Sequence, residues 1–267
     1  MKQVYLHGIG VFGPGLVGWP SCRAVLSSAQ AYVNEELPKL APQRLAPAVR
    51  RRTGDYIRLA IEVASEAVDQ CGIDASTLSS VFSTSDGDGQ IAHNICDAVR
   101  LDQAEPPVSP TQFHNSVANA PAGYWQQAVE SFEPSTSVAG FDHAFAVGMV
   151  EAVMQVTMEN RPILLVSHDV RFPEPLHSAR PMDSSFGVAM VLASEPMSGC
   201  IGSLDVSIQY ETGIETVLKD AQLDKVRLGN PAARSLSLLK AIADGGGEVA
   251  LNYPDSGLLL IKYSKMD

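Results

Sequence analysis

The most informative hydrophobic pattern lies in residues 135–154, STSVAGFDHAFAVGMVEAVM. A short β-favouring segment runs into a tight turn at Ala139-Gly140, and apolar or small residues occupy most of the circumference of the helix-spaced segment that follows. Its acidic residues, Asp142 and Glu151, are sparse, so the pattern predicts a buried helix. A strand that turns sharply into a helix is also a place where enzymes mount a nucleophile, because exposed amides and the positive helix end meet there. Taken alone, the segment favours a well-packed central helix over a nucleophile elbow.

The remaining hydrophobic pattern predicts strands and helices in alternation. The predicted helices span residues 55–71, 89–101, 117–131 and 141–158. The predicted strands span residues 2–9, 78–84, 163–166, 185–193 and 201–209. Gly72 is a plausible stop for the first helix, and residues 20–50, with prolines at 38, 42 and 47, are expected to form an irregular surface segment. This alternation predicts a layered α/β fold.

The tail of the chain is less regular. Helices are predicted at residues 214–223 and 232–243, and Gly245-Gly246-Gly247 is expected to interrupt the structure. Residues 248–252 and 257–263 are candidates for a pair of strands around a turn.

The composition indicates a folded protein. Of the 267 residues 45% are hydrophobic and 18% are charged, which is ample for a compact core. The net charge of −11 argues against nucleic acid or an anionic membrane as the main partner. The four cysteines (Cys22, Cys71, Cys96 and Cys200) lack metal-ligand spacing and are predicted to be buried thiols of a reducing compartment. No signal-type or membrane-length apolar run occurs, so we expect a cytoplasmic location.

Four segments, taken in order, resemble the N-terminal half of β-ketoacyl synthases, the condensing enzymes of fatty acid and polyketide synthesis. They are VYLHGIGVFGPG (4–15), RRTGDYIRLAIEVASEAVDQCGID (51–74), FSTSDGDGQIAHNICDAVR (82–100) and SPTQFHNSVANAPAGYW (109–125). The resemblance covers about residues 2–195. It is closest to short, stand-alone ketosynthase-like proteins, some of which are chain-length-factor-like partners in aryl polyene biosynthesis.

The resemblance also shows which catalytic groups the chain lacks. In the family a nucleophilic cysteine lies at the strand-to-helix turn, eight residues before a small residue that here matches Gly148, and this spacing puts Gly140 at the nucleophile position. The catalytic histidines of the family lie in C-terminal loops, whereas His177 is the last histidine here. The resemblance therefore implies that the chain does not catalyse condensation on its own. Cys96, the nearest cysteine in sequence, is predicted to pack in the core.

Other chemistry has weaker support. Asp142 and His143 are adjacent on a helix, so their side chains diverge by about 100° and cannot pair directly. The run Ser85–Gly89 suggests a metal loop, but it lacks the closing glutamate of a calcium site and fits a turn with Asp86 or Asp88 capping the next helix. We therefore expect no metal and no cofactor.

The resemblance places the segment around residue 113 at a subunit interface that lines an acyl pocket. Phe113, His114 and Ser116 are candidates for shaping that cavity, although a buried segment with satisfied polar groups fits equally well. Phe141 and Phe145 near the turn could form the floor of the channel.

Residues Arg50, Arg51 and Arg52 form the only basic cluster. Acyl carrier proteins are acidic, so this cluster could help to dock one, although a solvated lead-in to the following helix is the simpler interpretation. The negative net charge leads us to expect that a partner subunit does most of the carrier docking.

Together these inferences predict a thiolase-like fold with a mostly parallel core sheet, helices on both faces and a buried central helix. Residues 1–195 form the ketosynthase-like half, and residues 196–267 form a shortened portion that completes the same compact domain. The resemblance implies a non-catalytic, chain-length-factor-like partner that forms a heterodimer with a full-length ketosynthase and limits the acyl channel. Two alternatives remain open, namely an acyl thioesterase that uses His143 or His114 and a stand-alone acyl-binding module.

Overall fold

The computed structural model describes residues 2–100, 108–210 and 213–266. Its strands form one mixed sheet with the order β4-β3-β5-β6-β1-β7-β9-β8, and β2 pairs with β1 beside this path. The strands are β1 (Lys2–Gly13), β2 (Leu16–Val17), β3 (Ser79–Thr84), β4 (Ser135–Ala139), β5 (Ile163–Asp169), β6 (Phe186–Ala193), β7 (Gly202–Gln209), β8 (Gly246–Tyr253) and β9 (Gly257–Lys265). The α-helices are α1 (Trp19–Leu26), α2 (Pro47–Arg50), α3 (Asp55–Cys71), α4 (Gly89–Arg100), α5 (Pro110–Asn115), α6 (Ala120–Val129), α7 (Ala144–Glu159), α8 (Leu176–Ala179), α9 (Ala221–Leu228) and α10 (Leu236–Ala243). Short 3-10 turns occur at Ala75–Thr77, Phe141–His143 and Ala232–Ser235.

The expectation of a mostly parallel sheet is wrong. Only β3 pairs in parallel, with β4 on one side and β5 on the other, and the remaining described pairings are antiparallel. Neighbouring parallel strands must be joined by a crossover connection. The connection from β3 to β4 contains α6, and the connection from β4 to β5 contains α7. Later in the chain, β6 leads to β7 and β8 leads to β9 without a helix, whereas α9 and α10 lie between β7 and β8, and β1 inserts between β6 and β7.

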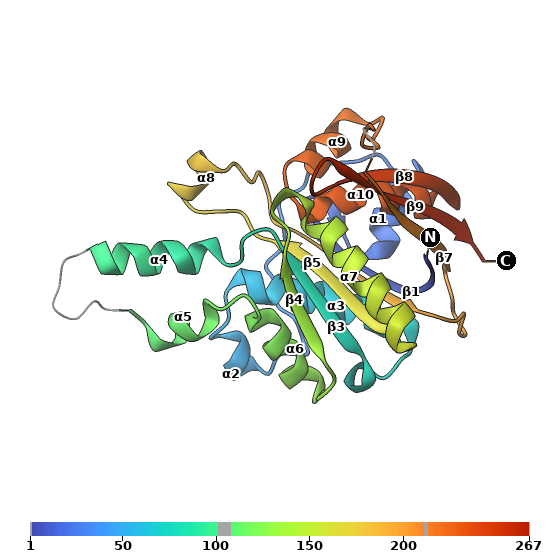
Figure 1. Ribbon diagram of the computed structural model, residues 1–267. Coiled ribbons are helices and arrows are strands. Elements are labelled where there is room, and N and C mark those ends of the chain that lie inside the picture. Colours follow the sequence, from blue (N-terminus) through green and yellow to red (C-terminus); the bar gives the residue numbers. More distant parts are fainter. Residues whose placement is uncertain (1, 101–107, 211–212, 267) are drawn as a thin grey trace.

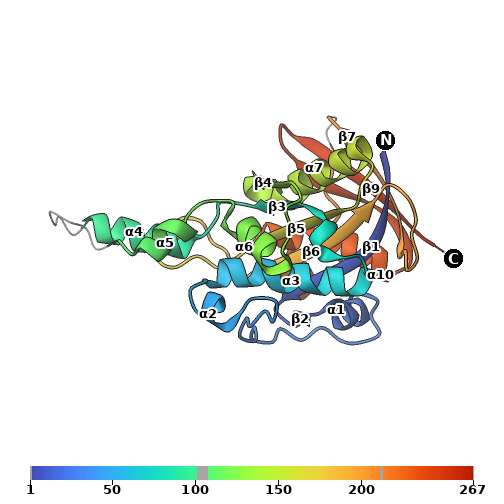
Figure 2. The ribbon, with the colours of Figure 1, turned by 90° about the horizontal axis from the view of Figure 1, so that it is seen from below.

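Helices cover both faces of the sheet (Figures 1 and 2). Helix α3 packs on one face, and two glycines of β1 allow its close approach: a Cβ at Gly8 or Gly10 would lie 2.0 Å from a carbonyl oxygen of α3. Gly72, with φ +67°, ends α3 in the left-handed conformation, as predicted. Helix α7 packs on the opposite face, and Figure 2 shows α3 and α7 on the two sides of the strands. The layered α/β architecture that the sequence predicts is therefore confirmed.

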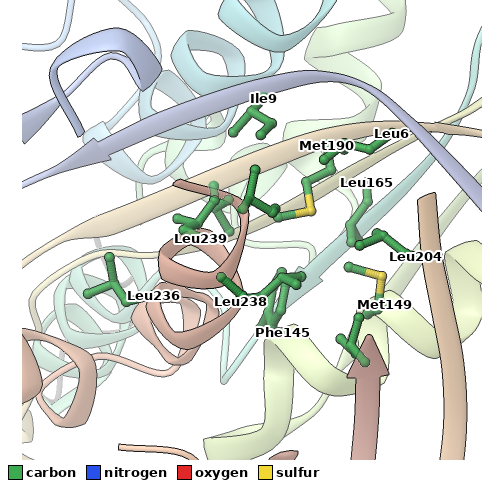
Figure 3. Close-up of a cluster of buried hydrophobic side chains, with 14 of the residues drawn as sticks. Leu6, Ile9, Phe145, Met149, Leu165, Met190, Leu204, Leu236, Leu238 and Leu239 are labelled. Carbon is green, nitrogen blue, oxygen red and sulfur yellow. The ribbon is translucent and has the colours of Figure 1, made fainter. Parts of the chain in front are cut away.

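The larger hydrophobic core lies on the α7 face. Figure 3 shows Phe145 and Met149 of α7 among Leu165 of β5, Met190 of β6 and Leu238 of α10. All five side chains are less than 2% exposed. Side chains from the C-terminal hairpin, including Leu251 and Ile261, belong to the same cluster. The sheet therefore covers one side of α7, and the C-terminal elements pack into the same core.

Helices α4 and α5 form an arm that extends away from the sheet (Figure 1). They contact each other, and only Ile91 of α4 is a fully buried apolar residue. Because little of α4 packs on the body, Cys96 is exposed, and its predicted place in the core is wrong.

Three boundary predictions fail for local reasons. The predicted irregular segment 20–50 begins with helix α1. The helix predicted at residues 214–223 begins instead at Ala221, because the Asp220 side chain accepts hydrogen bonds from the amides of Gln222 and Leu223. The predicted glycine break is shorter than expected, since Gly245, with φ +84°, separates α10 from β8 and β8 already starts at Gly246. Within the described residues, no helix combines the length and hydrophobicity needed to cross a membrane.

Candidate functional site

The strand-to-helix elbow lies where β4 leads into α7. The Gly140 amide donates to the carbonyl oxygen of Thr84 at 3.0 Å, which joins the elbow to the end of β3. The strained residue is Phe141, whose φ is +50°, one residue beyond the position expected for a nucleophile. Gly140 has a negative φ of −128° and is required for space, since a Cβ there would lie 2.7 Å from the Cα of Ala144. The elbow segment 139–143 carries neither a thiol nor a hydroxyl.

Arg180, on the loop before β6, covers the elbow. Its guanidinium lies 3.7 Å from the centre of the Phe141 ring, an arrangement in which a cation and a ring face attract. The same guanidinium forms an ion pair with Asp142 at 2.8 Å and a second ion pair with Asp86. Phe141 is 55% exposed, so the ring lies at the surface beneath this cation.

Two cavities meet at the elbow and share Asp142 and Arg234. One, of about 300 Å³, is lined by Phe141, Arg180 and Met182, and the other, of about 160 Å³, by His143 and Glu215. Glu215 binds Arg234 at 3.0 Å and the buried Arg227 at 2.9 Å. His143 Nδ1 is buried and makes no hydrogen bond to the described residues. The elbow therefore carries charged pairs and an imidazole but no nucleophile of the expected kind.

A buried polar cluster lies behind the elbow, at the ends of β3 and β5. Asp169 Oδ1 accepts hydrogen bonds from the Thr84 hydroxyl (2.8 Å), the Ser85 amide (2.8 Å) and the Ser85 hydroxyl (2.9 Å). Burial raises the pKa of Asp169 to about 6, and these donors oppose the rise. The Asn230 amide donates to the Asp169 carbonyl at 3.1 Å and to the Ser184 carbonyl at 2.8 Å. The cluster therefore fixes the turn that leads into α4.

His168 precedes Asp169 in β5, so the two side chains lie on opposite faces of the sheet. His168 is 1% exposed. Its ring lies 4.6 Å from the Tyr56 ring and 6.3 Å from the Phe82 ring, centre to centre. Neither ring nitrogen has a hydrogen-bond partner among the described residues. Burial lowers the pKa of His168 to about 3, so the imidazole is neutral near pH 7.

A groove of about 620 Å³ lies between α5 and α6. Phe113 and Val117 line it and are 67% and 51% exposed, and His114 lies beside them. The groove is fixed from behind by Asn115, which accepts from the Tyr124 hydroxyl at 2.9 Å and donates to the Arg52 carbonyl at 3.0 Å.

The sheet edge at β4 is the third feature of this region. Among the described strands β4 pairs only with β3, so its other edge has free backbone groups. Met154 and Met158 of the adjoining helix α7 are 42% and 73% exposed, and Phe132, just before β4, is fully exposed. An open edge with exposed apolar neighbours is typical of a protein interface.

The structure separates the predicted channel residues. Phe113 and His114 line the groove, whereas Ser116 is exposed outside its lining, with its hydroxyl bound to the Phe113 carbonyl at 2.8 Å. Phe141 lines the elbow cavity. Phe145 is 0% exposed in the core, so the prediction that it could form a channel floor is not supported by its position.

The basic cluster is also divided. The Arg50 guanidinium donates to the carbonyls of Ala41 and Pro42 at 3.1 Å, so it holds the chain locally. Arg51 and Arg52 are exposed. In the neighbouring turn, Asp88 caps α4 by accepting from the Ile91 amide at 3.0 Å, which confirms one of the two predicted caps, while Asp86 pairs with Arg180.

Sequence reasoning missed Arg180, Asp169, His168 and Asn230. Arg180 lies in an irregular loop without periodicity, and its partners Asp86 and Asp142 lie far away in sequence. No local signal therefore points to these ion pairs. His168 and Asp169 lie two and three residues after the predicted strand 163–166, and polar residues at the end of a buried strand are a signal that could have indicated them. Within the described residues, no group of histidine, cysteine or acidic side chains is arranged to hold a metal ion.

Comparison with protein families identifies the chain. The model of the β-ketoacyl synthase N-terminal domain matches residues 24–256. The chain belongs to the β-ketoacyl synthase family. No curated protein sequence matches it.

Solved structures share the fold at low sequence identity. The chain is similar to a structure described as the ketosynthase ApeO in complex with its chain length factor ApeC from Xenorhabdus doucetiae, with a TM-score of 0.74, 19% identity, and 98% of this chain and 100% of that one covered. It is also similar to the ishigamide ketosynthase/chain length factor, with a TM-score of 0.75, 12% identity and full coverage of both chains. A third match, with a TM-score of 0.75, 11% identity and 99% coverage of both chains, is AntDE:AntF, a type II polyketide synthase acyl-carrier protein in complex with its ketosynthase. The thiolase-like ketosynthase fold, implied earlier by the sequence motifs, is thus confirmed.

Proposed function

We propose that this protein is a non-catalytic, chain-length-factor-like partner of a β-ketoacyl-acyl-carrier-protein synthase. The observation that carries the proposal is the elbow, which has a strained strand-to-helix turn but carries Gly140 at the position where the family mounts a thiol, followed by the Phe141 ring. A ring cannot form the acyl thioester that condensation requires. The cation over that ring further restricts access from outside.

The proposed partner is a full-length ketosynthase, bound as a heterodimer. The free edge of β4 and the exposed methionines of α7 supply an interface of the kind that sheet pairing needs. The groove at Phe113 opens on the neighbouring helices α5 and α6, and α6 contacts β4. In this arrangement Phe113 reaches toward the acyl channel of the partner and limits the length of the growing chain. The similarity to named ketosynthase/chain-length-factor complexes supports this role, and polyketide or aryl polyene synthesis is the pathway class we propose.

Carrier docking falls mainly to the partner. Arg51 and Arg52 are exposed, and the Arg52 carbonyl binds Asn115 of α5, so the two residues offer a small basic contact for an acidic carrier, whereas Arg50 is engaged with backbone carbonyls. The net charge of −11 opposes approach of an acidic carrier elsewhere on this chain.

The test is co-expression with a candidate full-length ketosynthase, followed by light scattering on the purified material and mass spectrometry of the products. We expect a one-to-one complex that makes product and no condensation by this chain alone. Phe113→Ala should shift the product distribution toward longer chains, because truncation deepens the channel. Tyr210→Ala is the matched control, since Tyr210 is 69% exposed on the β7 side and should leave product length unchanged. Condensation by the isolated chain, or the absence of any complex, would contradict the proposal.

An acyl thioesterase is the second candidate, because His143 faces a charged cavity with an unpartnered ring nitrogen. Acyl-thioester hydrolysis that disappears in His143→Ala would support it, and loss in His114→Ala would place the activity in the groove. A stable monomer that binds acyl groups without a partner would instead support a stand-alone binding module.

A further inference from the structure

The loop between β5 and β6 carries one residue, Arg180, that contacts two regions far apart in the sequence. Its side chain is 21% exposed and pairs with Asp86 in the turn that starts the arm, and with Asp142 in the elbow. It also covers the Phe141 ring at 3.7 Å. Three segments, residues 85–88, 141–142 and the loop itself, therefore meet at a single guanidinium.

The turn that starts the arm has few other attachments to the body. Asp169 holds Ser85, and Phe172 of the same loop packs on Gly89, where a Cβ would lie 2.4 Å from the ring. Beyond Gly89, α4 contacts chiefly α5. The direction in which the arm extends (Figure 1) is thus set by the contacts at its base, and Arg180 supplies a side-chain contact to the elbow beside the Gly140–Thr84 backbone hydrogen bond.

The strained elbow also depends on this contact. A phenylalanine with φ +50° persists only where its surroundings hold it. The planar guanidinium lies over the Phe141 ring and pairs with the next residue, Asp142. A guanidinium makes these two interactions at once better than an ammonium group does. The elbow and the arm are therefore held by the same side chain.

We propose that Arg180 is a positioning residue that locks the elbow to the base of the α4–α5 arm, and so presents the Phe113 groove to the partner ketosynthase in one fixed orientation. The statement about the partner rests on the proposed function, whereas the lock itself is a property of the isolated chain. Substrate does not touch Arg180 in this proposal. Its effect on the partner surface is transmitted through Asp86 and the arm.

Hydrogen–deuterium exchange on the isolated full chain tests the lock. In Arg180→Gln we expect amides of residues 85–100 and 139–143 to exchange at least about tenfold faster, while β5 and β6 keep wild-type protection. Arg180→Lys, which keeps the charge but loses the planar fork, should recover only part of the protection. Arg161→Gln is the matched control, because Arg161 also makes two ion pairs, with Glu133 and Glu159, away from the arm and the elbow. Unchanged exchange in the arm and the elbow would overturn the proposal, as would equal acceleration of β5 and β6.

Two further variants keep the proposal testable if Arg180→Gln does not fold. Asp86→Asn, in the turn that starts the arm, should also accelerate exchange at the elbow. Asp142→Asn, in the elbow, should also accelerate exchange in the arm. Their double variant should accelerate exchange by less than the product of the single effects, because both lose the same guanidinium. Effects confined to each variant's own segment would refute the lock.

Measuring affinity for the partner separates the lock itself from its role in presenting the groove. With wild-type ketosynthase immobilised, Arg180→Gln should raise the dissociation constant at least about tenfold, and Lys240→Gln, which removes an ion pair on α10 at the other end of the sheet, should not. If the wild-type chain does not bind a ketosynthase, the proposed function fails, and the exchange experiment still decides whether the lock exists. If exchange changes but affinity does not, the lock stands and its role in presenting the groove is refuted.

Discussion

His168 and Asp169 are adjacent residues whose burial should give opposite pH dependences of stability. The ordinary pKa of histidine is 6.5, and burial lowers that of His168 to about 3. The folded state therefore holds the neutral imidazole, while the unfolded chain takes up a proton below pH 6.5. Stability from this residue is fully present above pH 6.5 and is lost as the pH falls toward 3.

The magnitude follows from the two pKa values. Each pKa unit corresponds to about 1.4 kcal/mol, so His168 should remove about 3 kcal/mol between pH 6.5 and pH 4.5 and about 5 kcal/mol by pH 3. His168→Leu keeps a similar volume and has no unpartnered ring nitrogens. Its advantage in stability over the wild type should therefore grow by about 3 kcal/mol when the pH is lowered from 7.5 to 4.5.

Asp169 supplies the contrast. Its pKa is raised from 3.8 to about 6, so the folded state binds a proton in a range where the unfolded chain does not, and stability is lost as the pH rises from 3.8 to 6. Asp169→Asn keeps the acceptor oxygen and cannot ionise. Relative to the wild type, this variant should gain about 2 kcal/mol between pH 4.5 and pH 6, the opposite sign to His168→Leu.

Urea unfolding of the full chain, followed by circular dichroism over this pH range, measures both differences. Val99→Leu, which changes an exposed apolar side chain on α4 and no titratable group, is the control and should differ from the wild type by a constant amount. Because each variant is compared with the wild type at the same pH, the titration of other groups cancels. A His168→Leu difference that does not vary with pH would refute the reasoning.

Other predictions concern packing, reactivity and domain organisation. Gly140→Ala should lower the free energy of unfolding by about 1–3 kcal/mol, because its Cβ would lie 2.7 Å from a backbone atom of α7; urea unfolding measures this. Phe145→Ala should cost about 3–5 kcal/mol and leave product length unchanged in the complex, as expected for a core residue. In the native protein a thiol reagent should modify Cys96 rapidly and not Cys22, where burial raises the pKa of the thiol. A chain that ends at residue 195 should show no cooperative urea transition, because the side chains that complete the α7 core would be missing.

Much of the fold was predictable because its helices and strands follow strong periodic patterns. Helix α3 lies at the predicted residues, 55–71, and the strands beginning near residues 79, 163, 186 and 202 agree within a few residues. The sheet order was not predictable, because the position of β1 between β6 and β7 depends on pairings that are distant in sequence. A hydrophobic pattern specifies which face of a strand is buried but not which strand lies beside it.

The candidate site was predictable in place but not in detail. The pattern around residue 140 located the elbow, because an abrupt change from strand to helix period is visible in a single sequence. Which residue takes the strained conformation depends on the packing of α7, and the structure assigns it to Phe141. Ion pairs such as Arg180–Asp86 join segments with no shared periodicity, so only the tertiary structure reveals them.

Several costly features gather at the carboxyl ends of the parallel strands β3, β4 and β5. Phe141 is strained beyond β4, and His168 and Asp169 are buried titratable groups at the end of β5, one without hydrogen-bond partners and one with an unpaired oxygen. A sequence optimised only for stability would replace such groups with apolar ones, and natural proteins keep them mainly at functional sites. Ligands of α/β proteins also bind at the carboxyl ends of their parallel strands. These arguments do not depend on the family resemblance, and they support the proposal that the elbow is a functional site even though it lacks a thiol.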